Sequence, residues 1–195
     1  TFAPMIDIGR DPRWGRVAEG FGEDPFLTGV MGAATIRGFQ GRAPHELAAR
    51  GRIAACAKHF AGYGASESGR DYNTTNIPEN ELRNVHLPPF RAAVEAGVAT
   101  IMTSFSDLDG VPATANEFLL RRVLRGEWGF DGVVVSDWES IRQLAVHGFT
   151  ATERDSAFEA ASAGVDIEMA STCYQQHLAW LVESGRISEA ALDAM

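Results

Sequence analysis

The sequence lacks the features that mark a membrane span or a nucleic-acid binder. No run of about 18 or more apolar residues occurs, so no transmembrane helix is predicted. Lys and Arg number 17 against 26 Asp and Glu, which gives a net charge of −9. Because phosphate backbones and anionic lipids attract basic surfaces, this balance argues against nucleic acid and the membrane as partners.

Cysteine is also scarce, since the 195 residues include only Cys56 and Cys173. Two cysteines do not make a disulfide scaffold, and neither has a close Cys or His neighbour at metal-ligand spacing. We therefore predict no zinc site. Two cysteines do not distinguish a protein of an oxidising compartment from one of a reducing compartment.

What the chain does contain is typical of a globular protein, with 45% hydrophobic and 22% charged residues. Short apolar runs alternate with longer stretches of helical periodicity. The runs that predict strands are residues 2–8, 53–60, 100–105, 132–137 and 165–169. The stretches that predict helices are residues 26–38, 78–96, 117–127, 140–147, 152–163 and 175–183. Pro88 and Pro89 divide or kink the second helix, and Ser188 predicts an N-cap for one more.

Repeated strand–helix units form either an open doubly wound sheet or a (β/α)8 barrel. Nearly continuous apolarity in short strands indicates a parallel sheet covered on both faces. No Gly-x-Gly-x-x-Gly loop follows the first run, which argues against the nucleotide-binding doubly wound sheet. Polar residues end several runs, as active-site residues of barrels do: Asp7, Lys58, His59, Ser104, Ser136 and Asp137.

We therefore predict an α/β fold, a partial TIM-like (β/α)8 barrel. It forms a single domain over residues 1–195 and holds about five of the eight strand–helix units of such a barrel. We expect the remaining strands before residue 1 and after residue 195.

The sharpest candidate site follows three valines, where Asp137 ends the fourth run and Trp138 follows it. A carboxylate that can attack an anomeric carbon, beside an aromatic face on which a sugar ring can stack, suits glycoside chemistry. The structural alternative is that Asp137 caps the next helix.

A second candidate is the adjacent pair Lys58 and His59, which precedes a loop with glycines at 62, 64 and 69. Both side chains can donate hydrogen bonds to sugar hydroxyls. The structural alternative is a buried Lys–carboxylate pair and a histidine with satisfied hydrogen bonds in the core.

A third candidate is the loop after the first run, with Arg10, Arg13, Trp14 and Arg16. It can form a bidentate anchor for a ligand or a salt-bridge cluster. We expect both, with one arginine facing the ligand.

A fourth segment ends the third run with Met102 and Phe105, which are more often core residues than ligand contacts. Isolated acids are expected to be solvated or to cap helices: Asp71, Asp107, Asp109, Glu139 and Glu168. The other histidines are expected to be structural: His45, His86, His147 and His177.

In this order, the four segments resemble glycoside hydrolase family 3. Residues 123–140 resemble the active-site signature of that family along their whole length, and residues 10–16 and 58–60 fit its β-glucosidase branch. The N-acetylglucosaminidase branch has a second histidine where this chain has Tyr63, so its mechanism is not supported. Phe105 stands where some relatives have a tyrosine, so a hydroxyl near the nucleophile would be absent.

The resemblance implies a role for each candidate residue. Asp137 is the catalytic nucleophile. The residues that bind substrate are Arg16, Lys58 and His59, which hold hydroxyls of the terminal sugar, Met102, which lines the pocket, and Trp138, which forms part of its aromatic wall. Asp7 and Asp11 are expected to brace the arginine loop.

The implied activity is that of a retaining, exo-acting β-glycosidase of the β-glucosidase type, which hydrolyses terminal non-reducing β-D-glucosyl residues of an oligosaccharide or β-glucoside. Alternatives are β-xylosidase specificity and a non-catalytic carbohydrate-binding barrel fragment. The family needs no cofactor or metal, and only His59 lies at the rim to serve a metal-dependent hydrolase. The resemblance also implies an acid/base Glu from a C-terminal domain of the same protein, a further sugar-binding Asp before residue 1, and a periplasmic or secreted location.

Overall fold

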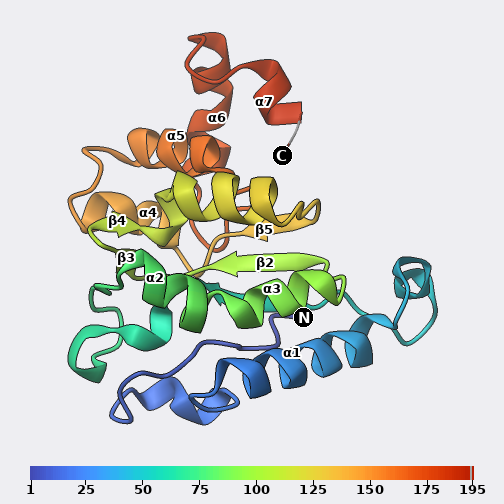
Figure 1. Ribbon diagram of the computed structural model, residues 1–195. Coiled ribbons are helices and arrows are strands. Elements are labelled where there is room, and N and C mark those ends of the chain that lie inside the picture. Colours follow the sequence, from blue (N-terminus) through green and yellow to red (C-terminus); the bar gives the residue numbers. More distant parts are fainter. Residues whose placement is uncertain (194) are drawn as a thin grey trace.

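The computed structural model describes residues 1–193 and 195 and has an α/β fold built on a parallel sheet (Figure 1). Three strands lie in the order β1 (Cys56–Phe60), β2 (Thr100–Thr103) and β5 (Val133–Val135), and both neighbouring pairs are parallel. Runs of β-branched and other apolar residues favour this buried extended backbone. The three central strands predicted from the sequence are therefore confirmed, with shorter bounds.

The two outer predicted strands, residues 2–8 and 165–169, form only single parallel bridges. Met5 bridges to Lys58, and Ile167 bridges to Val135. On the first edge, Pro4 has no N–H to donate to a ladder. On the other edge, the Asp166 carboxylate accepts the N–H of Val134 at 2.6 Å and so replaces a backbone acceptor.

Five parallel segments thus lie side by side in chain order, and helices connect each to the next. One face of the sheet, with Ala57 and Ile101, belongs to the main core beneath the helices. On the other face Cys56, Met102 and Val135 form a separate small cluster. The side chains on both faces are thus buried, as the apolar runs predict.

The α-helices begin and end close to their predicted bounds. They are α1 (Pro25–Gln40), α2 (Glu79–Glu81), α3 (Pro88–Glu95), α4 (Ser140–Val146), α5 (Glu153–Ala163), α6 (Cys173–Glu183) and α7 (Glu189–Asp193). Two segments are π-helical, η5 (Leu82–His86) and η7 (Phe118–Glu127). Short 3-10 helices are η1 (Gly15–Glu19), η2 (Pro44–Ala48), η3 (Tyr63–Ala65), η4 (Glu67–Gly69) and η6 (Ala113–Ala115), and a hairpin joins β3 (Asp107–Leu108) to β4 (Val111–Pro112).

Local sequence explains several of these ends. The Asp24 carboxylate accepts the N–H groups of the first turn of α1, and α1 runs on to Gly41, where φ is 94°, rather than stopping at Gly38. Pro88 begins α3, so the predicted division of residues 78–96 is confirmed. The Ser188 hydroxyl accepts the N–H of Ala191 at 3.1 Å, as expected of an N-cap. In the part of the chain that the structure describes, no helix is both long and apolar enough to cross a membrane.

Candidate active site

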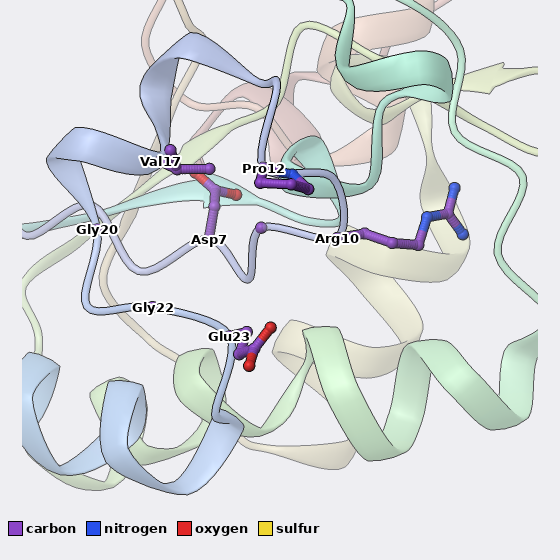
Figure 2. A pocket seen from close by; sticks show the side chains of 8 residues that line it. Asp7, Arg10, Pro12, Val17, Gly20, Gly22 and Glu23 are labelled. Atoms are coloured by element: carbon purple, nitrogen blue, oxygen red, sulfur yellow. The ribbon is translucent and has the colours of Figure 1, made fainter.

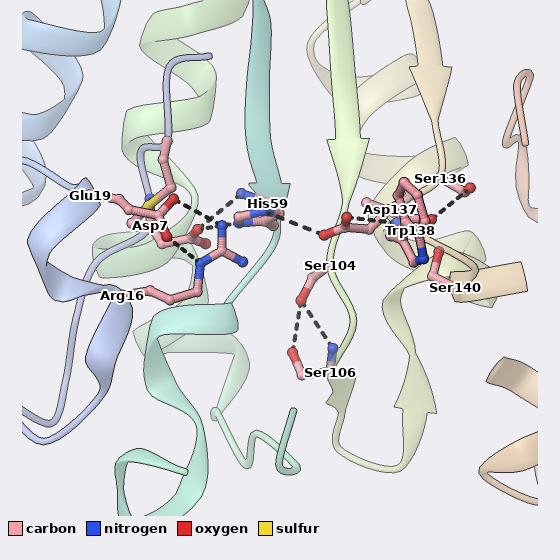
Figure 3. Close-up of polar contacts among 12 residues, drawn as sticks. Asp7, Arg16, Glu19, His59, Ser104, Ser106, Ser136, Asp137, Trp138 and Ser140 are labelled. Atoms are coloured by element: carbon pink, nitrogen blue, oxygen red, sulfur yellow. Dashed lines mark hydrogen bonds and ion pairs between the residues drawn. The ribbon is translucent and has the colours of Figure 1, made fainter. Parts of the chain in front are cut away.

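Polar side chains gather at the carboxyl ends of neighbouring segments of the sheet (Figure 3). Asp7 follows the Met5 bridge, His59 lies near the end of β1, Ser104 follows β2 and Asp137 follows β5. Because the segments are parallel, their carboxyl ends meet at one edge, and residues as far apart in the sequence as His59 and Asp137 become neighbours.

Asp137 places its carboxylate at this edge almost out of contact with solvent, at 7% exposure. One oxygen, Oδ1, accepts the backbone N–H of Trp138 at 2.7 Å. The other, Oδ2, has no hydrogen bond within the described residues and lies 3.4 Å from Nε2 of His59. The carboxylate does not cap α4, because Glu139 occupies the N-cap position, so the structural alternative for Asp137 is wrong.

Burial and the neighbouring charges shift the pKa of Asp137 in opposite directions. Burial raises the pKa of the Asp137 carboxyl above its ordinary value. The charge of His59 and the N–H of Trp138 lower that pKa, and Arg16 and Lys58 lower it further. The carboxylate is thus desolvated, yet it is surrounded by positive charge that favours its ionised form.

His59 lies between two carboxylates. Its Nδ1 is 2.8 Å from Oδ2 of Asp7, and its backbone N–H donates to the same oxygen at 3.1 Å. The ring also packs edge-on against Tyr63, with 5.2 Å between ring centroids. The expectation that Asp7 braces the arginine loop is therefore wrong, since its carboxylate holds His59.

All three arginines of this loop form ion pairs, as the salt-bridge alternative predicts. Arg13 pairs with Asp11 at 2.6 Å on the surface, and Arg10 pairs with Glu67. Arg16 lies on the side of Asp7 and His59 in Figure 3 and pairs with Glu19 at 2.7 Å. Burial opposes the charged form, but the Glu19 ion pair raises the pKa of Arg16 above its ordinary value.

Arg16 is further held by the aromatic side chain beneath it. Its guanidinium carbon lies 5.5 Å from the centroid of the Tyr63 ring, and Tyr63 is completely buried. Tyr63 was noted in the sequence only for the histidine that it replaces, and its packing role was missed. An aromatic residue inside a glycine-rich loop at a strand end was the available signal.

Lys58 is half-buried in the middle of β1 and hydrogen-bonds through its backbone to the first segment. Its ammonium group makes no hydrogen bond or ion pair with any described residue. The alternative of a buried Lys–carboxylate pair is therefore not realised.

The remaining predicted residues differ in exposure. Trp138 presents 62% of its surface to solvent. Met102 is buried with Cys56 and Val135 on the face of the sheet opposite the main core. Phe105 packs against Tyr72 with 4.9 Å between ring centroids. Trp138 is thus available for stacking, whereas Met102 and Phe105 are packed in apolar clusters.

All five isolated acids have defined structural partners, and two of them test the prediction made from the sequence. Asp71 accepts a hydrogen bond from the indole nitrogen of Trp14 at 2.8 Å, so the expectation that it is only solvated or capping is wrong. Glu168 accepts the N–H groups of Cys173 and Tyr174 at the start of α6, so its predicted capping role is confirmed.

A cavity of about 290 Å³ adjoins the site (Figure 2). It is lined by Asp7, Gly9, Arg10, Pro12, Val17, Gly20, Gly22 and Glu23. Neither His59 nor Asp137 lines it, so Asp7 stands between this cavity and the candidate nucleophile. Over residues 1–193 and 195, no group of three or more His, Cys, Asp or Glu side chains is arranged to hold a metal ion.

Residues 1–195 match the family described as Glycosyl hydrolase family 3 N terminal domain. The chain belongs to this family. The resemblance drawn from the signature around Asp137 is thereby confirmed, and the agreement covers the whole chain.

Relatives of the family 3 chain carry glycosidase names. A periplasmic beta-glucosidase of Salmonella typhimurium is 45% identical over 193 residues, covering 99% of this chain and 25% of that protein. A beta-xylosidase of Formosa agariphila is 41% identical over 171 residues, covering 86% of this chain and 24% of that protein. The crystal structure of a beta-glucosidase from Listeria innocua in complex with glucose has 48% identity and a TM-score of 0.97, covering 100% of this chain and 27% of that chain. The chain spans about a quarter of the length of these relatives.

Proposed function

We propose that the protein containing this chain is a retaining, exo-acting β-glycosidase of the β-glucosidase type. The observation that carries the proposal is the position of Asp137, whose buried carboxylate has one oxygen free of hydrogen bonds and 3.4 Å from His59. A desolvated carboxylate with a free oxygen is suited to attack an anomeric carbon. Family membership and the β-glucosidase names of the relatives support the same reaction class.

In the proposed reaction, the free oxygen of Asp137 attacks the anomeric carbon of a terminal sugar and displaces the leaving alcohol. A covalent glycosyl-enzyme forms and is hydrolysed by water with retained configuration. Lys58 and Arg16 donate hydrogen bonds to hydroxyls of the sugar, which fixes the ring for attack. The exposed ring of Trp138 stacks against the apolar face of the sugar.

Retaining hydrolysis also needs a second carboxyl group, roughly 5–5.5 Å from the nucleophile, to protonate the leaving oxygen. We propose that a Glu of a C-terminal domain of the same protein supplies it, because the chain spans only about a quarter of its relatives. The proposal therefore concerns the longer protein, and the 195 residues hold the nucleophile side of its site.

We further propose that the five parallel segments are part of a closed (β/α)8 barrel that constitutes one domain. Neighbouring segments follow chain order, which suits a barrel better than a doubly wound sheet, where the order reverses. The inner cluster of Cys56, Met102 and Val135 is also the kind of packing that fills a barrel interior.

The β-xylosidase relative favours a second specificity, since xylose lacks only the hydroxymethyl group of glucose. Comparing kcat/KM on aryl β-glucosides and aryl β-xylosides distinguishes the two. The periplasmic name of the Salmonella relative supports a periplasmic or secreted location for this protein as well.

The decisive experiment is labelling of the full-length protein with a 2-deoxy-2-fluoro-β-glucosyl fluoride, which traps the covalent intermediate. The expected result is one sugar on Asp137, identified by peptide mass spectrometry. A label on another carboxylate would show that the nucleophile is misassigned. Sugar binding without any hydrolysis would instead identify a non-catalytic carbohydrate-binding protein.

A further inference from the structure

The inference concerns Asp7, a residue to which the proposed chemistry assigns no role. Its side chain has 0% exposure, and its Oδ2 receives both the backbone N–H and Nδ1 of His59. Its second oxygen, Oδ1, is buried and has no hydrogen-bond partner within the described residues. A carboxylate so desolvated is stabilised only if a positive charge lies against it.

His59 touches a carboxylate at each of its ring nitrogens. Nδ1 lies 2.8 Å from Asp7, and Nε2 lies 3.4 Å from Asp137. A neutral imidazole carries only one N–H, so it turns a lone pair toward one of the two carboxylates. The imidazolium form has an N–H on each ring nitrogen and can direct one at each carboxylate.

One proton can therefore occupy either of two positions between His59 and Asp137. It is either on Nε2, giving an imidazolium beside a carboxylate, or on Oδ2, giving a neutral ring beside a carboxylic acid. Only the first arrangement leaves Asp137 able to act as a nucleophile. The negative charge of Asp7, 2.8 Å from the far side of the ring, favours the first.

Resting on the proposed function, we propose that Asp7 is a positioning residue that holds His59 as an imidazolium against Asp137 and so keeps the nucleophile ionised. Because the ring donates to Asp7, its plane is fixed, and Nε2 stays directed at the nucleophile. The Asp7 side chain has 0% exposure and contacts the ring of His59, so we expect it to act only through His59.

Other charged groups near Asp7, His59 and Asp137 also affect whether the proton lies on His59 or on Asp137. From η1, Arg16 favours the carboxylate of Asp137, and Glu19 faces Lys58 and His59. Lys58 adds positive charge from β1, the Tyr63 ring packs on His59 from η3, and His86 faces Asp7 from η5. These groups remain in place when Asp7 alone is changed, so its contribution can be measured separately.

The test uses Asp7→Asn in the full-length protein, because asparagine keeps an acceptor for Nδ1–H and for the backbone N–H but removes the charge. The quantity measured is the rate of covalent labelling by the fluoro-sugar as a function of pH. We expect the acid limb of this pH profile to shift up by about one pH unit. The labelling rate should then fall about tenfold at pH values below the limb and change little on the alkaline plateau. Asp11→Asn removes a carboxylate from the same loop that pairs only with surface Arg13, and it should leave the limb unmoved.

A purely structural role for Asp7 predicts a different result. The labelling rate would then fall by a similar factor at every pH, with the acid limb unchanged, and the proposal would be overturned. A measurement on the unmutated protein covers the case in which Asp7→Asn does not fold. Nitrogen NMR of ¹⁵N-labelled histidine, with His59 assigned by His59→Gln, should show both ring nitrogens protonated at the pH of maximal labelling.

A neutral His59 ring at that pH would also overturn the proposal. If the unmutated protein hydrolyses no glycoside and takes up no label, the proposed function fails instead. The NMR measurement at pH 6 then still tests the pairing of Asp7 with His59, so the two failures are distinguishable.

Discussion

The indole nitrogen of Trp14 donates a hydrogen bond to the carboxylate of Asp71, with 2.8 Å between the two atoms. This contact joins the arginine loop to the loop after β1, 57 residues further along the chain. Trp14 is 1% exposed and packs edge-on against Tyr63, whose ring lies under Arg16. The position of Arg16, the arginine that we propose binds the sugar, therefore depends on a buried tryptophan.

Trp14→Ala should destabilise the protein strongly, because it leaves a cavity and removes the partner of Asp71. Replacing a buried tryptophan by alanine costs about 3–5 kcal/mol. Trp138→Ala is the matched control, since that side chain is 62% exposed and its removal should change stability by less than about 0.5 kcal/mol. Thermal or denaturant unfolding of the two variants checks this, and equal losses in both would contradict the burial argument.

Lys58 is the only lysine of the sequence, and its ammonium group has no partner among the described side chains. Lys58→Met keeps the apolar stem and removes a charged donor, so stability should stay nearly constant while sugar binding weakens. A charged hydrogen bond contributes roughly 1.5–3 kcal/mol, so kcat/KM should fall about 10- to 100-fold.

Arg91→Met serves as the control for Lys58→Met. Arg91 is exposed on α3 and pairs only with Glu95 of the same helix, so kcat/KM should not change. An unchanged kcat/KM for Lys58→Met on aryl β-glucosides would remove Lys58 from the sugar-binding site.

Asp166 holds the last parallel segment against β5. Its Oδ2 accepts from Arg125 at 2.8 Å and from the N–H of Val134 at 2.6 Å, while Arg125 also donates to the backbone carbonyls of Phe130 and Gly132. Asp166→Ala leaves a buried N–H and a guanidinium without their acceptor, which should cost about 3 kcal/mol.

The control for Asp166→Ala is Asp131→Ala, an exposed carboxylate in the turn just before β5. Its stability should lie within about 0.5 kcal/mol of the unmutated protein. A loss of the same size in both variants would mean that the turn, rather than the Asp166 network, is responsible.

The sequence was sufficient to predict the parts of this fold that depend on local chemistry. Three valines before Asp137 predict a buried strand, Pro88 predicts a helix start, and Ser188 predicts a cap; each of these is confirmed. The outer segments were predicted too strongly as strands. Apolar runs do not reveal that Pro4 lacks a donor for the ladder or that Asp166 takes over an acceptor position.

The sequence yields candidate residues for the site but not their pairings. Asp137 and His59 were candidates because they end predicted strands, and parallel strands bring such residues to one edge. Arg16 was singled out from the arginine loop only by the resemblance to the family. The partner of His59 was missed, because Asp7 lies 52 positions away and next to a loop rich in arginines. Which carboxylate pairs with which cation depends on side-chain directions at that edge, and no spacing in the sequence encodes them.

Asp137 should make the protein less stable at neutral pH than an uncharged side chain would. Burial raises the pKa of its carboxyl in the folded protein above its ordinary value of 3.8, so the folded state binds the proton more tightly than the unfolded state. The free energy of unfolding therefore decreases as pH rises from 3.8 through the folded pKa, and the full destabilisation is present above it. Asp137→Asn should raise Tm at pH 7 and lose that advantage below pH 3.8, while labelling by the fluoro-sugar is abolished. Ser136 and Trp138 are unchanged in this variant, so a Tm that does not rise at pH 7 would show that positive charge from His59, Arg16 and Lys58 outweighs the burial of the nucleophile.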